Sequence, residues 1–323
     1  MTARPFRFAV QSGGTDTPDA WRDLARRAEQ LGYSTLAVAD HYIGPGPALE
    51  AANHPVQQLA AIPAMTVAAE ATTDLSVACR VLSTGYHNAV VAAKELASID
   101  WFSGGRVEVG LGAGWVSSEY EAMGVPFERA GRRVDRLIEF TSVLRACFAG
   151  GPVDENGEIV SASGFTAVPE PPHGRPPLMI GGGSPRVLRF AGGVADTVSV
   201  NFDNSSGRIG AEGMASGAAE ATAAKIAWVR DGAGDRFADI ELEVGAYFTA
   251  VTGDPQRALD RIATTVGVAP ELLDGNPHVL VGSAEEIVDT LLARREQHGF
   301  SYVTVDDRVM EAFAPVVAAL AGR

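Results

Sequence analysis

The chain has 323 residues, 46% of them hydrophobic, and its 40 acidic and 26 basic side chains give a formal net charge of −14. An acidic chain without a basic run is poorly suited to bind a polyanion, so we do not expect a nucleic-acid-binding protein. Two cysteines, no long apolar run and no signal-peptide pattern argue against a disulfide framework, a membrane span and secretion, so we expect a cytoplasmic protein.

Strand and helix patterns alternate along the chain. Short apolar runs end in polar or glycine-rich segments, and amphipathic runs follow them. The expected strands cover residues 6–11, 34–39, 75–82, 107–111, 177–180, 196–200, 241–249 and 301–305. The expected helices cover residues 17–31, 55–69, 89–102, 131–148, 218–229, 254–265, 284–298 and 309–320, and a further helix begins at Pro185. A weak hairpin signal surrounds Val153 and Phe165.

This alternation predicts an α/β fold. Eight strands that are each followed by at least one helix indicate a (β/α)8 TIM barrel, with loop insertions at its C-terminal face and one domain over residues 1–323. The alternative is an open doubly wound sheet. Neither glycine cluster fits the dinucleotide fingerprint of such sheets, because Trp115 and Arg186 occupy the places of the third glycine.

The segment 177–188 carries the clearest binding signal. An apolar strand runs into Gly181, Gly182, Gly183 and Ser184, and Pro185 then opens a helix. Uncovered backbone N–H groups and the partial positive charge of a helix start favour an anion, most often a phosphate. The alternative is a tight strand-to-helix turn without a ligand.

Active sites of TIM barrels form where the strands end. His41 follows the second expected strand and is a candidate general acid/base or hydrogen-bond donor to a cofactor ring, with Asp40 beside it. The alternative is a histidine satisfied by Asp40 or the backbone. His87 is a weaker candidate, and the remaining histidines are expected at the surface: His54, His173, His278 and His298.

The residues that several types of reaction require are missing from these strand ends. No carboxylate pair is placed for glycoside hydrolysis, and no His-x-His follows the first strand to hold a hydrolytic metal, so we expect no metal. Lys94 and Lys225 fall inside expected helices, which argues against Schiff-base chemistry. A phosphate site, glycine-lined strand ends and His41 suit a flat phosphorylated cofactor that carries the chemistry itself.

Four segments resemble the luciferase-like monooxygenase superfamily. They are 36–42, 97–107, 110–115 and the stretch from Ile180 to Asp196. The ending 299–305 with 314–317 resembles the actinobacterial branch that uses the deazaflavin coenzyme F420. The resemblance implies a TIM barrel, a homodimer, and a deazaflavin across the C-terminal mouth of the barrel.

The resemblance also implies roles for single residues. The cofactor phosphate would meet the glycine turn and Asn201, the ring system would lie near Asp40 and His41, and a non-proline cis peptide would fall within 79–81. The implied catalytic residue is His41, and the implied cofactor-binding residues are Asp40, Cys79, Arg80, Val81, Gly112, Ala113, Gly114, Trp115, Gly181, Gly182, Gly183, Ser184 and Asn201.

The resulting expectation is an F420-dependent oxidoreductase that moves a hydride between the deazaflavin and a small organic substrate. One alternative is an FMN-dependent monooxygenase that uses oxygen and reduced flavin from a partner reductase. Another is a non-catalytic flavin-binding protein. Glucose 6-phosphate is a doubtful substrate, because Trp115 stands where F420-dependent sugar-phosphate dehydrogenases of the superfamily have a glutamate, and Gln11-Ser12 replaces an acid after the first strand.

Overall fold

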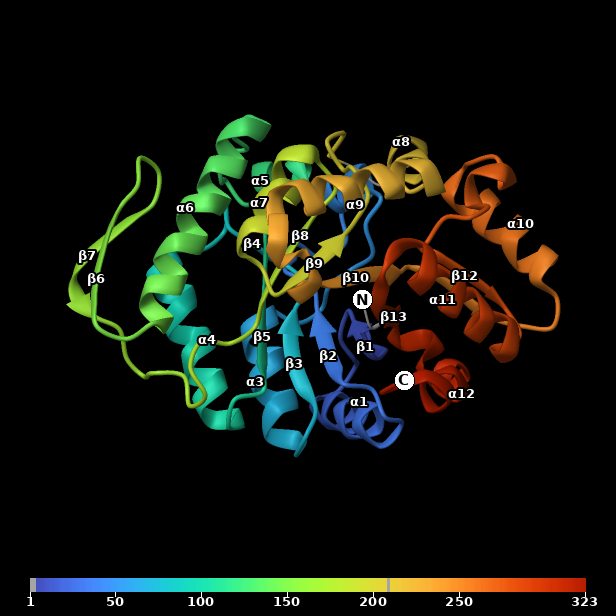
Figure 1. The fold of residues 1–323 in the computed structure, drawn as a ribbon, viewed down its shortest axis with the longest axis horizontal. Coiled ribbons are helices and arrows are strands. Elements are labelled where there is room, and N and C mark those ends of the chain that lie inside the picture. The colour runs from blue at the N-terminus through green and yellow to red at the C-terminus, as the bar shows by residue number, and fades with distance from the viewer. Residues whose placement is uncertain (1–3, 208–209) are drawn as a thin grey trace.

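Eight parallel strands close into a barrel in the computed structural model of the chain, which describes residues 4–207 and 210–323 (Figure 1). The order around the barrel is β1, β2, β3, β5, β8, β9, β10 and β13, and β13 pairs with β1 to close it. The strands are β1 (Arg7–Ser12), β2 (Thr35–Val38), β3 (Ser76–Cys79), β5 (Val107–Gly112), β8 (Leu178–Gly182), β9 (Thr197–Val200), β10 (Glu241–Ala246) and β13 (Phe300–Asp306). The predicted TIM barrel is confirmed.

Helices cover the outside of the barrel (Figure 1). Those that follow the strands are α1 (Pro18–Gln30), α3 (Ala61–Ala71), α4 (Ala89–Ser103), α6 (Ala130–Phe148), α7 (Pro185–Val194), α9 (Ala219–Ala233), α11 (Ala284–His298) and α12 (Met310–Leu320). Their starts follow local rules: the Thr17 side chain accepts from the Ala20 amide, and Pro18 opens α1. Within the described residues, no helix combines the length and apolarity needed to cross a membrane.

Several boundaries differ from the sequence prediction. The expected strand 75–82 is interrupted, because β3 ends at Cys79 and a short strand β4 (Leu82–Ser83) resumes after a cis peptide between Arg80 and Val81. The helix expected from residue 55 begins only at Ala61. The expected loops contain three short helices, α2 (Pro47–Ala52), α5 (Ser117–Ala122) and α8 (Ala211–Ala215).

Two insertions decorate the barrel. Strands β6 (Pro152–Asn156) and β7 (Ser161–Thr166) form the predicted antiparallel hairpin, with Val153 opposite Phe165. The single strand expected over 241–249 is wrong, because the chain leaves the barrel after Ala246. It then forms a separate parallel pair, β11 (Phe248–Val251) with β12 (Val279–Gly282), joined through α10 (Pro255–Val266). This pair has a small hydrophobic core of its own, built on Met214, Ala263, Leu273 and Val279. Three short 3-10 helices complete the elements: η1 (Gly234–Asp239), η2 (Pro270–Leu273) and η3 (Asp307–Val309).

Two layers of the barrel interior are charged, unlike the aliphatic filling typical of this fold, and a small apolar cluster of Ala9, Met179 and Tyr302 accompanies them. In the lower layer, Arg7 donates to Glu108 at 2.5 Å and to Glu241 at 2.7 Å, and its guanidinium lies 3.6 Å from the centre of the Tyr302 ring. Because these side chains point into the barrel, the alternate apolar residues of the same strands face the helices, where the main core lies. A buried charge of this kind is tolerated because it is paired.

A second charged layer lies nearer the C-terminal ends of the strands. Arg80 Nε donates to Glu243 Oε1 at 2.9 Å, and Thr304 donates to the same oxygen at 2.7 Å. Arg80 also donates to Gln11 Oε1 at 2.9 Å. We call this layer of Arg80, Glu243 and their partners the charged floor of the mouth.

Candidate active site

The strand ends gather most of the predicted site residues at one end of the barrel, where the arrowheads of β1, β2 and β3 point in Figure 1. The rings of His41 and Trp115 lie 6.2 Å apart in an edge contact. The Asn201 amide donates to the Gly182 carbonyl at 2.9 Å, which joins the ends of β8 and β9. Residues far apart in the sequence therefore share this mouth.

His41 is held by a carboxylate that the sequence did not reveal. Its Nδ1 lies 2.6 Å from Glu119 Oε2, and Glu119 on α5 has a side chain that is only 1% exposed. The Tyr42 amide donates to the other oxygen, Oε1, at 2.6 Å, and the Tyr86 hydroxyl donates to Oε2 at 3.2 Å. Burial alone would raise the pKa of Glu119, but the hydrogen bonds from His41, Tyr42 and Tyr86 lower it below its usual value.

Asp40 belongs to a second carboxylate–imidazole pair. Its Oδ2 accepts from His87 Nε2 and from the Ser83 amide, both at 2.8 Å. Burial lowers the pKa of His87, but the hydrogen bond and charge of Asp40 outweigh burial and raise it above the ordinary value. The other oxygen, Oδ1, is buried and has no hydrogen-bond partner among the described residues. Asp40 therefore contacts the mouth indirectly, through its hydrogen bonds with the His87 side chain and the Ser83 amide.

A second imidazole packs against His41 at a tilt of 45°. The ring of His54 lies 4.0 Å from that of His41 and 5.7 Å from that of Trp115. Burial, followed by the neighbouring charge of His41, lowers the pKa of His54 to about 4, so this ring is neutral at pH 7. His54 lies in a loop and is partly exposed, in line with the surface prediction, but its ring also packs against His41 and Trp115.

The three predicted residues 79–81 lie in different surroundings. Val81 is partly exposed and its methyl groups lie over the backbone of Gly112 and Gly181, where an added Cβ would come within 2.6 Å and 3.1 Å of them. Arg80 is 7% exposed and points into the charged floor, and Cys79 is fully buried in the core between barrel and helices. Cys79 and Arg80 thus face opposite sides of the strand, and their contacts to a cofactor stay a prediction.

The turn after β5 is shaped by contacts within the protein. Gly114 adopts a left-handed backbone with φ of 75°, and an added Cβ there would lie 2.1 Å from the Tyr120 hydroxyl. That hydroxyl is 2.7 Å from Ser83 Oγ. Ala113 packs partly against the core, and Trp115 remains partly exposed beside His41. Of this turn, Trp115 therefore offers the largest surface to a ligand.

The turn after β8 has the features of an anion site. Gly181, Gly182 and Ser184 are partly exposed, while Gly183 is buried with its Cα against the backbone of Phe202. The Ser184 side chain does not cap α7, and no acidic residue stands in the first turn of that helix. The first backbone N–H groups of α7 have no partner inside the helix, so they and the serine hydroxyl are suited to a bound anion.

Asn201 links this turn to the charged floor. Its Nδ2 donates to the Tyr247 hydroxyl at 2.8 Å, and Arg80 donates to the same hydroxyl at 3.1 Å. The Asn201 carbonyl accepts from Lys225 Nζ at 2.6 Å, and burial lowers the pKa of Lys225 to about 8. Lys225 does lie in a helix, as expected, but its amino group anchors the segment that borders the mouth.

Two histidines that were expected at the surface are buried. His278 is 1% exposed, donates from Nδ1 to the Gly245 carbonyl at 2.7 Å and packs against Phe202 at 4.0 Å between ring centres. His298 is 7% exposed and packs on Phe300. Burial lowers the pKa of His278 to about 3 and also lowers that of His298. His173 is exposed, as predicted.

Two carboxylates lie near the mouth, one directly after the last barrel strand and one that no local motif indicates. Asp307, beyond the end of β13, accepts a short hydrogen bond from Ser12 Oγ at the end of β1. Glu119 stands four residues after Trp115 and turns back to His41. The only sequence signal for Glu119 is its place in the first turn of a short helix, which does not identify its partner.

A sequence model described as luciferase-like monooxygenase matches residues 2–270 of the chain. The chain belongs to the luciferase-like monooxygenase family. It is 24% identical over 328 residues to a 5,10-methylenetetrahydromethanopterin reductase of Methanopyrus kandleri, covering 95% of this chain and 84% of the relative. It is 32% identical over 138 residues to an FMNH(2)-dependent dimethylsulfone monooxygenase of Pseudomonas putida, covering 42% of this chain and 38% of the relative.

A solved structure supports the fold. The coenzyme F420 dependent tetrahydromethanopterin reductase from Methanopyrus kandleri superposes with a TM-score of 0.75, covering 98% of each chain at 19% sequence identity. At this identity the likeness shows the barrel and its connections. The relatives in this family are oxidoreductases, which supports an enzyme here, and they divide between F420 and FMN.

Proposed function

We propose that this chain is an F420-dependent oxidoreductase that transfers a hydride between the deazaflavin and a small organic substrate. The observation that carries the proposal is the pairing, in one barrel mouth, of a helix-start turn at β8–α7 that has no acidic residue with His41 on a buried carboxylate. The first suits the phosphate end of a cofactor, and the second suits proton transfer beside its ring.

The residues of the mouth fit such a cofactor. Gly182, Gly183 and Ser184 would hold the phosphate, because their turn offers backbone N–H groups without a competing acidic side chain. Val81 and Trp115 are partly exposed apolar side chains that would contact the ring system. When bound, F420 supplies a two-electron hydride carrier, and the protein supplies its position and its surroundings.

His41 supplies or accepts the proton that accompanies hydride transfer. Its Nδ1 is engaged by Glu119, so Nε2 is the ring atom available to a substrate or cofactor. Trp115 and His54 pack against the imidazole and leave its side chain 13% exposed. These contacts orient the proton-transfer atom before a substrate arrives.

Titration of the purified protein with F420 and, separately, with FMN tests the proposal. We expect F420 to bind with a saturable change in its fluorescence, and FMN to bind more weakly. Tight FMN binding without F420 binding would replace the proposal by an FMN-dependent monooxygenase that needs a partner reductase. In a His41→Ala variant, we expect F420 to remain bound and turnover of any accepted substrate to fall by at least about a hundredfold. Unchanged turnover would remove His41 from catalysis.

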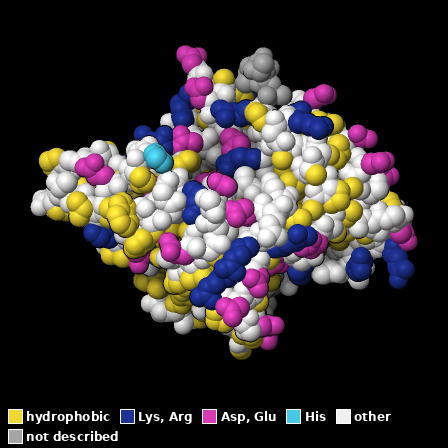
Figure 2. Space-filling model, turned by 90° about the horizontal axis from the view of Figure 1, so that it is seen from below, with side chains coloured by type: hydrophobic (Ala, Val, Ile, Leu, Met, Phe, Trp, Pro, Cys, Tyr) yellow, Lys and Arg dark blue, Asp and Glu magenta, His cyan; other side chains and the backbone are white. Residues whose placement is uncertain are grey.

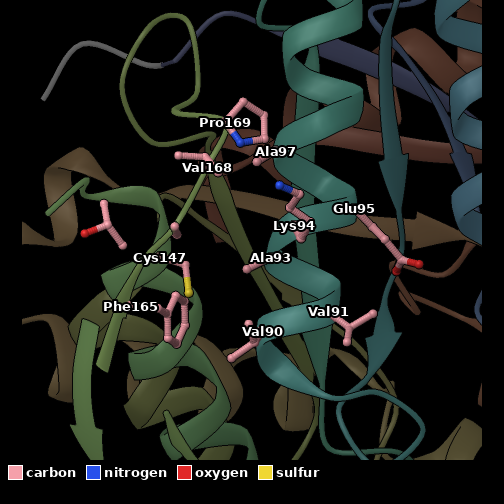
Figure 3. A pocket seen from close by; sticks show the side chains of 12 residues that line it. Val90, Val91, Ala93, Lys94, Glu95, Ala97, Cys147, Phe165, Val168 and Pro169 are labelled. Carbon is pink, nitrogen blue, oxygen red and sulfur yellow. The ribbon is translucent and has the colours of Figure 1, made fainter. Parts of the chain in front are cut away.

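We also propose that two copies of this chain associate through α4. Val91, Trp101 and Phe102 on this helix have exposed fractions of 54%, 60% and 59%, and Figure 2 shows hydrophobic side chains on the side of the molecule where α4 and the hairpin lie. A groove of about 340 Å³ beside them is lined by α4, Cys147 of α6 and the segment that follows Phe165 (Figure 3). Lys94 and Glu95 lie in its wall, so a two-fold related copy would bring opposite charges together.

The oligomeric state tests this surface. We expect a dimer by light scattering coupled to size exclusion, and a monomer for the double variant Trp101→Glu and Phe102→Glu, because charges in an apolar interface are not paired. Val56→Glu, a partly exposed valine outside α4, is the matched control and should stay dimeric. A wild-type protein that is monomeric at micromolar concentrations would contradict the proposal.

A further inference from the structure

Glu119, on the six-residue helix α5, accepts hydrogen bonds from several groups of the mouth. It is 1% exposed, and its two oxygens accept from three donors: His41 Nδ1, the Tyr42 amide and the Tyr86 hydroxyl. The lowered pKa keeps it ionised. A buried ionised group is costly unless its partners compensate for lost hydration, so these contacts show that the carboxylate is built into the site.

The contact with His41 also defines the protonation of that ring. A distance of 2.6 Å between Nδ1 and Oε2 is a hydrogen-bond distance. An ionised carboxylate only accepts, so the imidazole nitrogen must carry the proton. An unprotonated Nδ1 would set two lone pairs against each other at this distance. The neutral ring therefore has its free lone pair on Nε2.

Other groups packed on His41 do not compete for this role. His54 covers one face of the ring, and its own Nδ1 lies 2.7 Å from the Pro55 carbonyl. Trp115 contacts the ring edge-on. Of the two neighbouring imidazoles, His41 has the carboxylate partner, while His54 stays neutral at pH 7.

We propose that Glu119 is a positioning residue that fixes His41 in its Nδ1-protonated form and aims Nε2 into the mouth. Nε2 is then the atom that gives or takes the proton during hydride transfer. This second step rests on the proposed function, whereas the tautomer and the orientation of the ring stand on the contact between His41 and Glu119. Removing Glu119 should let His41 rotate and adopt the other tautomer.

Long-range proton–nitrogen correlation spectra of the protein labelled with 15N-histidine, recorded without cofactor, test the first step. The His41 signals are assigned by their loss in His41→Gln. We expect a protonated Nδ1 and an unprotonated Nε2 in the neutral ring of the wild type. In Glu119→Met, which lacks the acceptor, we expect the Nε2-protonated form to gain population. Glu119→Gln serves as the second variant if Glu119→Met does not fold, since it keeps the shape of the side chain but removes its charge.

Two matched variants separate this role from a general structural one. Tyr86→Phe removes one donor to Glu119 but leaves the carboxylate, and should keep the His41 tautomer. Asp40→Asn alters the other pair, and should change the signals of His87 and spare those of His41. A wild-type His41 protonated at Nε2, or an unchanged tautomer in both Glu119 variants, would overturn the proposal.

F420 titration of single and double variants connects the tautomer to the cofactor. We expect Glu119→Met to weaken F420 binding by up to about tenfold, the scale of one hydrogen bond. If Glu119 acts through His41, the double variant Glu119→Met and His41→Gln should bind F420 as His41→Gln does, within about twofold. Additive losses would show that Glu119 acts independently. If the wild type fails to bind F420, the proposed function fails, while the spectra still decide the tautomer.

Discussion

The two sides of the barrel mouth are built in different ways. On the side of β2, β3 and β5, ionisable side chains form the pairs His41–Glu119 and His87–Asp40, with exposed fractions near zero for both carboxylates. On the side of β8 and β9, the mouth is formed by glycines, backbone amides and Ser184. The difference separates two tasks: paired ionisable groups can hold and move a proton, whereas a backbone turn offers a fixed field that does not titrate.

Gly183→Ala is the substitution expected to damage the backbone side most. An added Cβ would lie 2.2 Å from the Phe202 carbonyl oxygen and 2.7 Å from that of Asn201, and neither backbone can move aside without opening the end of β9. We expect a loss of about 3 kcal/mol in the free energy of unfolding, measured in urea, together with weaker F420 binding.

Gly193→Ala on the same helix is the matched control. The nearest atom to its added Cβ, the Gly232 carbonyl oxygen, is at an ordinary 3.6 Å, so this variant should be as stable as the wild type or slightly more stable. Equal stability of the two variants would show that the turn is not held as rigidly as the distances require.

The free energy of unfolding, measured at several pH values, tests the side of the mouth that carries ionisable groups. The informative residue there is His54. Its pKa is about 4 in the folded protein and about 6.5 when unfolded, so the unfolded state binds more protons between these values. Its contribution is therefore complete above about pH 6.5 and is lost as the pH falls toward 4. We expect the wild type to lose about 2 kcal/mol more than His54→Gln between about pH 7 and pH 4.5, from urea unfolding at each pH. Parallel curves for the two proteins would contradict the burial of this ring.

The same contrast explains what the sequence could predict. The turn Gly181–Ser184 was predicted well because glycine, proline and a helix start act locally. The pairing of His41 with Glu119 spans 78 residues and depends on how α5 folds back after β5, which no local pattern encodes. His278 was misplaced for a related reason, since the β11–β12 insertion that buries it begins where one continuous strand was expected. The charged floor of Arg80 and Glu243 was not anticipated, because alternation along each strand predicts which residues share a face but not their partners across the barrel.

Replacing His87 should give the smallest change in stability. The pH dependence of that change should have the opposite sign to that of His54. Asp40 raises the pKa of His87 above its unfolded value against the effect of burial, so the folded protein binds the extra proton. The stability contributed by this pair is complete below about pH 6.5 and is lost as the pH rises through the raised pKa. We expect the stability difference between the wild type and His87→Gln to shrink by up to about 1 kcal/mol between about pH 6 and pH 9, the scale of a weak ion pair. The exposed His173, replaced by Gln, should show no such trend. A difference that grows with pH would mean that His87 is bound as the neutral imidazole, and the ionisable side would then hold its charge on the His41–Glu119 pair alone.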